Sequence, residues 1–564
     1  MTSSGGGGGG GGSPHRGGTL RLLGQSDIFN LDPVSAYYTV SSMLERMWTR
    51  QLFSYRNVSN WTEQTTPVPD VATEMPTTTN GGITDSGKTY TIHIRSGVMW
   101  DTSPPRQVTA ADFVRQFKVL CNPASPVGAP GYFTSTIVGM QNYCNGFAKV
   151  KATASAISGY VNSHNLPGVV AAGPQTLVFH LINPATDFVN ILAMGFCSAR
   201  PVENMQYVPD SPQYRQHTLS DGPYKITAYT ADRSFTLARN PAWKATTDPL
   251  RHAYVNAVTV TEGLDSAGVQ QQLQAGTGDM EWDVGPPPQD LPSLMSSHNS
   301  GLVISAQPTG FTYVTLNQYA GPFTNLKVRQ AVAYALNKNA IVRILGGPSI
   351  AQPATQFMLP GSVGYVGNFN PYPNNSNNGD AAKSKALLKE AGQSNVTIKL
   401  IYSTTDPTPR EAQVLESALQ AGGFTVKLMP VTQSDWYAKY LEQPSTAKSG
   451  VWDISLPGWI PDWFGNNGRA TIQPLFSSPG ELSNDFTGYN SPVTNGLINK
   501  ALTSTTKSAA ASYWAQANEQ VVKDVADVPL INQRWTLYHS AQVHGCIFFV
   551  NALNCDPTNV WLSG

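Results

Sequence analysis

Charged residues are scarce in this sequence. Asp, Glu, Lys and Arg together make up 13% of the 564 residues, about half the usual share of a soluble domain. The 36 basic and 36 acidic side chains cancel, so there is no basic excess to neutralise nucleic-acid phosphates. We therefore expect no nucleic-acid partner. A polar but weakly charged surface of this kind is common in secreted proteins.

Long hydrophobic runs are also missing. No apolar stretch reaches about 18 residues, so we expect no membrane-spanning helix. The first residues lack the pattern of a signal peptide, and residues 5–12 are an unbroken run of glycine, which behaves as a flexible tether because it cannot form a core. Two interpretations stay open. The run is either a linker added for expression, or the spacer after a lipid-anchored cysteine that this sequence lacks.

Motifs of catalysis and metal binding are mostly absent. The sequence has no GxSxG elbow, P-loop or HExxH, and its nine histidines do not cluster beyond His539 and His544. We expect no metal site and no cofactor. Two SxxK tetrapeptides, at 445–448 and 504–507, match one element of acyl-serine enzymes. The Lys-Ser-Gly at 448–450 overlaps the first of them and cannot also serve as the separate KTG-type strand, so an acyl-serine hydrolase is a distant alternative.

The few cysteines indicate an oxidising compartment. None of the five lies in a CxxC pair, which argues against a zinc ribbon or a thioredoxin-type site. Cys546 and Cys555 suit a hairpin staple, and Cys121 and Cys144 bracket a loop rich in Pro and Gly. We predict these two disulfides, with Cys197 buried and unpaired; the alternative is five reduced core cysteines. Closing a loop of about 24 residues stabilises a fold by roughly 3 kcal/mol.

The length of the chain predicts more than one lobe, because a single core stops growing well below 564 residues. Strands alternate with helices after residue 310, which is typical of an α/β lobe. The predicted strands are 18–23, 88–94, 176–182, 311–317, 396–402 and 425–429, and the predicted helices are 40–52, 109–120, 325–336, 380–392 and 411–419. Stretches 284–292 and 366–380, rich in Pro, Gly and Asn, are expected to be surface loops.

The most informative stretch is Val-Trp-Asp-Ile-Ser-Leu-Pro-Gly-Trp-Ile-Pro-Asp-Trp-Phe at 451–464. A short strand, 452–456, should end at Pro457-Gly458, and Asp462 then stands between Trp459 and Trp463. Ligand sites of α/β lobes form at strand carboxyl ends. A carboxylate there can bind an ammonium group, and indoles add cation–π attraction. The alternative is that both tryptophans are core and Asp462 caps a turn.

Segments along the whole chain, from about Gly17 to Leu562, resemble the extracellular solute-binding proteins of family 5, the oligopeptide- and dipeptide-binding proteins of ABC importers. They stand in the family's order at 19–22 with 30–33, 88–100, 108–113, 221–225, 239–243, 323–338 and 458–463. One segment departs from the pattern. The family's G-x-x-W-x-D-G-x-P continues here as Asp101-Thr-Ser-Pro-Pro, without the usual Asp-Gly.

The resemblance implies an α/β fold of two lobes, the periplasmic-binding-protein type II or Venus-flytrap fold, with an extra subdomain inserted in lobe one. Ligand would be engulfed as the lobes close about a hinge. The implied boundaries are a tether at 1–16, lobe one at 17–57, 189–304 and 529–564, the inserted subdomain at 58–188, and lobe two at 305–528.

The resemblance also implies ligand contacts. Asp462 would grip the α-amino group of a peptide, with Trp459 and Trp463 in the same loop. Trp436 would line side-chain pockets, and Tyr489 lies in a loop that would face the cleft.

Further contacts are implied elsewhere in the chain. Tyr37 and Tyr38 fall where the first lobe's loop would touch ligand. Phe311, Tyr313 and Asn317 belong to the segment that would pair with an extended peptide backbone, a β-augmentation mode. A cation that some relatives carry before the Gly-Trp loop is replaced by Ser-Leu-Pro at 455–457, so Arg410 is the nearest candidate to hold a ligand carboxylate.

The implied function is that of a binding protein and not an enzyme. It would capture oligopeptides in an interlobe cleft and deliver them to the membrane permease subunits of an ABC transporter. It would act as an extracellular monomer, lipid-anchored to the outer face of the cytoplasmic membrane in the Gram-positive manner. The alternative keeps the fold and binds an oligosaccharide, a metal chelate, haem or an antibiotic-pathway intermediate; a sugar would need the tryptophans but not Asp462.

Overall fold

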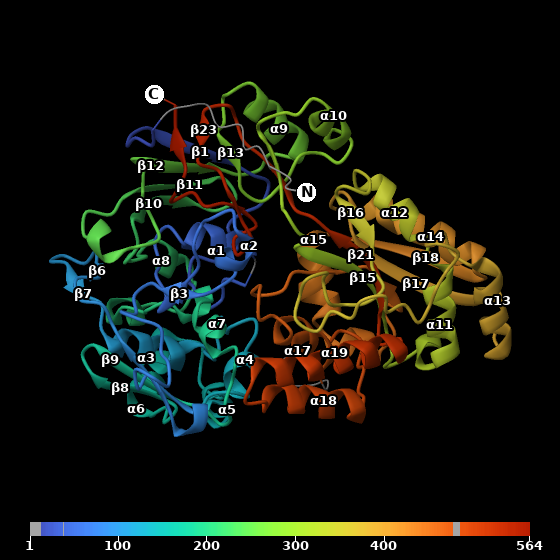
Figure 1. Cartoon of the computed structure of the whole chain (residues 1–564), viewed down its shortest axis with the longest axis horizontal. Helices are drawn as coiled ribbons and strands as arrows, with labels where there is room; N and C mark the ends of the chain where they lie inside the picture. Colours follow the sequence, from blue (N-terminus) through green and yellow to red (C-terminus); the bar gives the residue numbers. More distant parts are fainter. Residues whose placement is uncertain (1–12, 38, 478–484, 564) are drawn as a thin grey trace. The chain divides into compact units, whose positions relative to one another are not determined.

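The computed structural model describes residues 13–37, 39–477 and 485–563, which fall into two compact units (Figure 1). Unit 1 is drawn from Met1–Pro287, Met295–Val303 and Thr536–Gly564, and unit 2 from Pro288–Leu294 and Ile304–Trp535. The predicted start of the last stretch of lobe one, at residue 529, is too early, because strand β21 (Val528–Gln533) belongs to the unit 2 sheet. The inserted subdomain at 58–188 stays a prediction.

The main sheet of unit 1 has five strands in the order β10-β11-β12-β1-β13. They are β1 (Thr19–Leu23), β10 (Tyr224–Thr230), β11 (Ser234–Arg239), β12 (Ala257–Thr261) and β13 (Met280–Glu281). Strand β1 runs parallel to both β12 and β13, whereas β10 and β11 are antiparallel additions. The loops that follow β1, β12 and β13 therefore meet at one edge of the sheet, where α/β folds place their ligands.

A second, antiparallel sheet of unit 1 has the order β4-β5-β9-β8. It consists of β4 (Ile83–Thr84), β5 (Thr89–His93), β8 (Val169–Gly173) and β9 (Thr176–His180), and helix α3 (Ala110–Val119) packs on β8 and β9. Thr109 and Asp112 form a capping box at the start of α3, which satisfies backbone groups of its first turn.

The helix predicted at 40–52 is shorter than its apolar pattern suggests. Helix α1 spans Thr39–Glu45, and the chain then turns. The next residues include two arginines with buried side chains, Arg46 bonded to Asp556 (2.8 Å) and Arg50 bonded to Asp70 (2.7 Å). Because a buried charge needs its partner, these long-range pairs override the local helical pattern.

The remaining elements of unit 1 are short. The strands are β2 (Phe53–Ser54), β3 (Val68–Pro69), β6 (Met99–Trp100), β7 (Arg106–Gln107), β23 (Val543–His544), β24 (Phe548–Phe549), β25 (Asn554–Cys555) and β26 (Trp561–Leu562), and β14 (Leu302–Ile304) pairs with β22 (Thr536–Tyr538). The helices are α2 (Trp61–Gln64), α4 (Gly131–Thr134), α5 (Met140–Phe147), α6 (Ala154–Ser163), α7 (Phe188–Leu192), α8 (Pro212–Arg215), α9 (Ser266–Gln274) and, reaching across the division, α10 (Leu291–Ser296).

Unit 2 is built on a seven-stranded sheet in the order β16-β21-β15-β19-β17-β18, with β20 also paired to β15. Besides β21, its strands are β15 (Gly310–Leu316), β16 (Ala351–Pro353), β17 (Val396–Ser403), β18 (Phe424–Val431), β19 (Ile454–Ser455) and β20 (Gly458–Trp459). Strands β18, β17 and β19 are parallel, and β15 runs antiparallel to β19, β20 and β21.

The helices of unit 2 include the three that the sequence predicts at 325–336, 380–392 and 411–419. They are α11 (Leu326–Ala335), α12 (Lys338–Ile344), α13 (Ala381–Glu390), α14 (Thr408–Ala421), α15 (Gln433–Asp435), α16 (Pro444–Lys448), α17 (Arg469–Phe476), α18 (Pro492–Leu502) and α19 (Lys507–Lys523), with a π-helical turn at Trp436–Leu441. Asn325 and Asp380 cap α11 and α13 through their side chains, and Gly392, at φ 68°, follows α13.

The predicted cysteine pairing is confirmed. Cys121 is bonded to Cys144 and Cys546 to Cys555, while Cys197 is buried and free. Burial raises the pKa of the Cys197 thiol well above its ordinary value, so it stays protonated and unreactive. No helix in the described part of the chain combines the length and the apolar character needed to cross a membrane.

Candidate ligand-binding site

The stretch predicted to hold ligand runs along β15 as a strand with one interruption. Ser455 of β19 lies opposite Thr315, and Trp459 of β20 lies opposite Phe311. Between them the Pro457 carbonyl accepts the Tyr313 N–H at 3.1 Å. Strand β19 therefore ends before Pro457-Gly458, as expected, and the pairing resumes in β20, because a proline lacks only its donor and its carbonyl can still accept a hydrogen bond.

Strand β20 is paired on one side, whereas β19 before it is paired on both. Strand β19 pairs with β17 at Leu400, but β20 pairs with β15 alone among the described strands. Gly458 is exposed, and Trp459 and Asp462 are half-buried. The backbone of β20 therefore presents an unpaired edge beside a carboxylate and an indole, a place where an extended chain can add as a further strand.

The two tryptophans of this loop differ. The Trp459 indole N–H donates to the Ala470 carbonyl at 2.9 Å and the ring stays half-exposed. Trp463 is 1% exposed and its indole N–H donates to the Asn466 carbonyl at 2.7 Å. Trp463 thus belongs to the core, as the alternative interpretation held for both rings, whereas Trp459 keeps a surface that a ligand can reach.

Trp436 is buried behind the same strands. It opens the π-helical turn that follows β18 and α15, and it packs in a hydrophobic cluster with Ile401 and Trp452. Its indole N–H donates to the Ser455 hydroxyl at 2.9 Å, which in turn donates to the Ile401 carbonyl at 2.7 Å. With 4% of its surface exposed, this side chain supports the strand that carries the loop.

The expected β-augmentation on 311–317 is wrong. Strand β15 pairs with β19 and β20 on one edge and with β21 on the other, so its backbone has no edge to offer a peptide. Phe311 and Tyr313 are 3% and 1% exposed and both contact the Phe357 ring at 6.0 Å between centroids. Asn317 is fully buried.

The Asn317 side chain joins three segments of unit 2. Its amide nitrogen donates to the carbonyls of Ala447 (2.8 Å) and Trp452 (2.9 Å), and its oxygen accepts the Tyr319 N–H (3.0 Å). Both donor hydrogens are used. The residue is therefore placed as a structural bracket and has no donor left for a ligand.

Three other predicted contacts are engaged with neighbours in their own units. The Tyr489 hydroxyl donates to Asp524 at 2.6 Å and contacts the Thr494 hydroxyl, and burial, with the Asp524 bond, raises its pKa. Arg410, in the first turn of α14, is half-exposed and bonds Asp406 at 2.9 Å. In unit 1, the half-buried Tyr37 ring lies 5.7 Å from Phe196. Tyr38 lies outside the described residues.

A family model for bacterial extracellular solute-binding proteins, the middle region of family 5, matches residues 66–480, most of the chain. This chain belongs to the bacterial extracellular solute-binding proteins of family 5. The oligopeptide-binding protein OppA of Bacillus subtilis is 25% identical over 529 residues, covering 91% of this chain and 87% of the relative. Heme-binding protein A of Haemophilus influenzae is 27% identical over 467 residues, covering 79% and 77%.

The fold of this family 5 chain matches that of solved relatives. The structure of clavulanic acid biosynthesis oligopeptide binding protein 2 superposes with a TM-score of 0.85 at 22% identity, covering 98% of this chain and 96% of that one. The two-lobed α/β fold inferred from the resemblance is thus confirmed.

Unit 1 of the family 5 chain carries three carboxylates that the sequence pattern did not single out as ligand contacts. Asp27, Glu262 and Asp283 follow β1, β12 and β13, at the shared edge of the main sheet. Asp283 accepts the N–H groups of Gln25 and Ser26, each at 2.8 Å. The signal in the sequence that could have located this group is a carboxylate shortly after each of three parallel strands.

Glu262 is the unusual member of this group. It is 7% exposed, and neither of its carboxylate oxygens has a hydrogen-bond partner among the described residues. Burial, followed by the charge of Asp27, raises its pKa to about 8. The side chain is therefore protonated at neutral pH and can donate a hydrogen bond.

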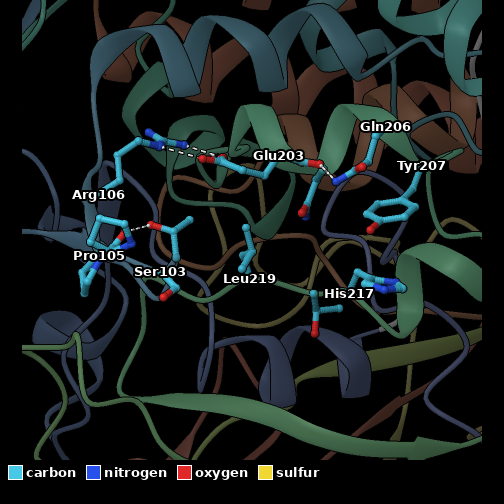
Figure 2. Close-up of a pocket in the computed structure, with 12 residues that line it drawn as sticks. Ser103, Pro105, Arg106, Glu203, Gln206, Tyr207, His217 and Leu219 are labelled. Carbon is cyan, nitrogen blue, oxygen red and sulfur yellow. Dashed lines mark hydrogen bonds and ion pairs between the residues drawn. The ribbon is translucent and has the colours of Figure 1, made fainter.

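A cavity of about 720 Å³ in unit 1 is lined by a different set of residues (Figure 2). Arg106 and Glu203 form a two-bond ion pair at one side, with a shortest distance of 2.8 Å. Tyr207 stacks on His217 at the other side, with ring centroids 4.7 Å apart. Because its charges neutralise each other, this cavity has no evident preference for a charged ligand. Among the described residues, no group of three or more His, Cys, Asp or Glu could hold a metal ion.

Proposed function

We propose that this family 5 protein captures oligopeptides outside the cell and delivers them to the permease subunits of an ABC transporter. The observation that carries the proposal is the loop at 458–462. A peptide added as a strand to the unpaired edge of β20 would make backbone hydrogen bonds that do not depend on its side chains. Such binding suits a protein that accepts many sequences.

The end of the peptide would be fixed by charge. Asp462 stands four residues beyond Gly458 on the same loop, where its carboxylate can receive the α-ammonium group of the first peptide residue. Trp459 would lie against that residue and contribute apolar area and cation–π attraction. Arg410 is already bonded to Asp406. The main charged contact would therefore be made with the amino terminus of the peptide and not with its carboxyl terminus.

The test is a cycle of one substitution and one ligand modification. A peptide and its N-acetylated form are titrated calorimetrically into the unsubstituted protein and into Asp462→Asn. We expect Asp462→Asn to weaken the binding of the peptide with a free amino group by about 2–5 kcal/mol, because a desolvated ammonium loses its partner. The same substitution should leave the acetylated peptide nearly unaffected. Equal affinity of the unsubstituted protein for both peptides would refute the amine anchor.

A second candidate keeps the fold and changes the ligand. The half-exposed Trp459 ring beside exposed Gly458 would suit stacking against a sugar or haem as well as against a peptide. On this alternative Trp459→Ala abolishes binding and Asp462→Asn does not. One relative carries the name heme-binding protein A.

We further propose that the chain is a monomer without catalytic activity, held at the outer face of the cytoplasmic membrane by a lipid at the head of its glycine tether. The second SxxK serine supports the absence of acyl transfer, because the Ser504 hydroxyl donates to the Lys500 carbonyl at 2.7 Å. Light scattering on the purified protein tests whether it is a monomer. A penicillin-type label tests for acyl-serine activity, and detergent partitioning of the cellular form tests for the lipid anchor.

A further inference from the structure

A second cavity of unit 1, about 300 Å³, lies where the first described residues meet the end of the chain. Its lining comes from five separate stretches and comprises Pro14, Arg56, Asn57, Val58, Pro249, Leu250, His252, Tyr254, Gly545, Ile547, Asn559 and Trp561. None of these residues is acidic. The cavity therefore differs from the larger one, whose arginine is matched by a glutamate.

The charge of Arg56 is uncompensated. Its side chain is exposed at the cavity, and its guanidinium has no hydrogen bond or ion pair within the described residues. The acids of the adjoining segments are buried and occupied elsewhere: Asp556 is bonded to Arg46 at 2.8 Å, and Asp248 pairs with Arg251 at 3.3 Å. An isolated guanidinium beside a cavity without carboxylates favours an anion.

Two further side chains with hydrogen-bonding groups, His252 and Asn57, line the same cavity. The His252 ring lies 5.3 Å from the Tyr254 ring, and neither ring nitrogen has a hydrogen-bond partner in the described structure. The Asn57 side-chain oxygen is buried without a partner. Its amide nitrogen is not buried and donates to no described residue, so this nitrogen is the donor that Asn57 offers to the cavity.

Apolar surface completes the cavity. Trp561 is 8% exposed and lies between two histidines, with His544 stacked at 4.3 Å and His15 edge-on at 5.2 Å between ring centroids. Val58, Leu250 and Ile547 add aliphatic surface. The cavity thus combines one free cation and several donors with room for an organic group.

We infer that this cavity binds the phosphate group of a phosphate ester. A guanidinium fork takes two phosphate oxygens, and a tetrahedral anion has further oxygens for His252 and Asn57. A carboxylate would be satisfied by the fork alone and would leave the other donors idle. The ester is either the headgroup of an anionic phospholipid or a soluble phosphate compound, since both offer the same chemistry.

The experiment separates these sources. Glycerol 3-phosphate is titrated into the full-length protein, and the protein is sedimented with vesicles of phosphatidylcholine alone or mixed equally with phosphatidylglycerol. Arg56→Gln and His252→Gln test the cavity. Arg233→Gln is the matched control, because Arg233 is an exposed arginine in the turn between β10 and β11 of the same unit.

We expect Arg56→Gln to weaken binding about tenfold, the effect of one charge-assisted hydrogen bond, and Arg233→Gln to leave it unchanged. Peptide binding should be the same in all variants, since none of these residues belongs to the proposed peptide site. Binding only to vesicles that contain phosphatidylglycerol supports a lipid headgroup, and binding of glycerol 3-phosphate supports a soluble ester. No binding to either, or equal loss in Arg56→Gln and Arg233→Gln, overturns the inference.

Discussion

Replacing Asn317 by alanine tests whether this residue supports the fold or contacts ligand. The substitution removes two donated hydrogen bonds, to Ala447 and Trp452, and one accepted bond from Tyr319. The three backbone groups are left without their partner in a fully buried position. At about 1–3 kcal/mol for each unsatisfied buried group, partly relieved by water entering the space, we expect a loss of ~3–5 kcal/mol in the free energy of unfolding of unit 2.

The assay is urea unfolding, followed by tryptophan fluorescence and by circular dichroism, since two units need not unfold together. Asn499→Ala, an exposed asparagine on helix α18 of the same unit, is the matched control and should change stability by less than about 0.5 kcal/mol. Peptide affinity, measured at a temperature where both variants are folded, should stay within about threefold of the original value. Near-normal stability combined with a large loss of peptide affinity would show that Asn317 contacts ligand and does not mainly support the fold.

Three further predictions follow from buried groups. The pKa of the Glu262 carboxyl is raised from 4.5 to about 8. Between these pH values the folded chain holds a proton that the unfolded chain releases, so the stability of the protein falls as pH rises. In thermal melts, Glu262→Gln should leave stability unchanged near pH 4 and raise it by ~1–2 kcal/mol near pH 9, and an equal effect at both pH values would contradict this. Trp436→Phe removes the bond to Ser455 and should lower the free energy of unfolding by about 2 kcal/mol in urea, whereas unchanged stability with weakened peptide binding would place the indole in a ligand pocket. The single free thiol, Cys197, should resist a thiol reagent in the native protein. It should react once the protein is unfolded without reductant, and more than one reactive thiol per chain would contradict the two disulfides.

The sequence was a good guide to elements whose cause is local. Strands β15, β17 and β18 and helices α11 and α13 follow from the apolar pattern of their own residues, and Asn325 caps α11. The disulfides could be predicted because each joins cysteines close in sequence.

Elements decided by distant contacts were predicted less well. Helix α1 ends early where Arg46 and Arg50 turn toward partners elsewhere in unit 1. The bracket role of Asn317 depends on Ala447, 130 residues away. The resemblance to family 5 located the loop of Asp462 but could not tell which aromatic side chains of the neighbourhood are core.

The ligand itself is the most direct test of the account. Native mass spectrometry of the protein as purified, followed by denaturation and identification of the released molecules, reports what the site holds without a choice of probe. If the protein captures oligopeptides by their amino termini, we expect a set of short peptides of mixed sequence with free amino termini. A sugar, a metal chelate or haem in their place, or peptides with blocked amino termini, would contradict it.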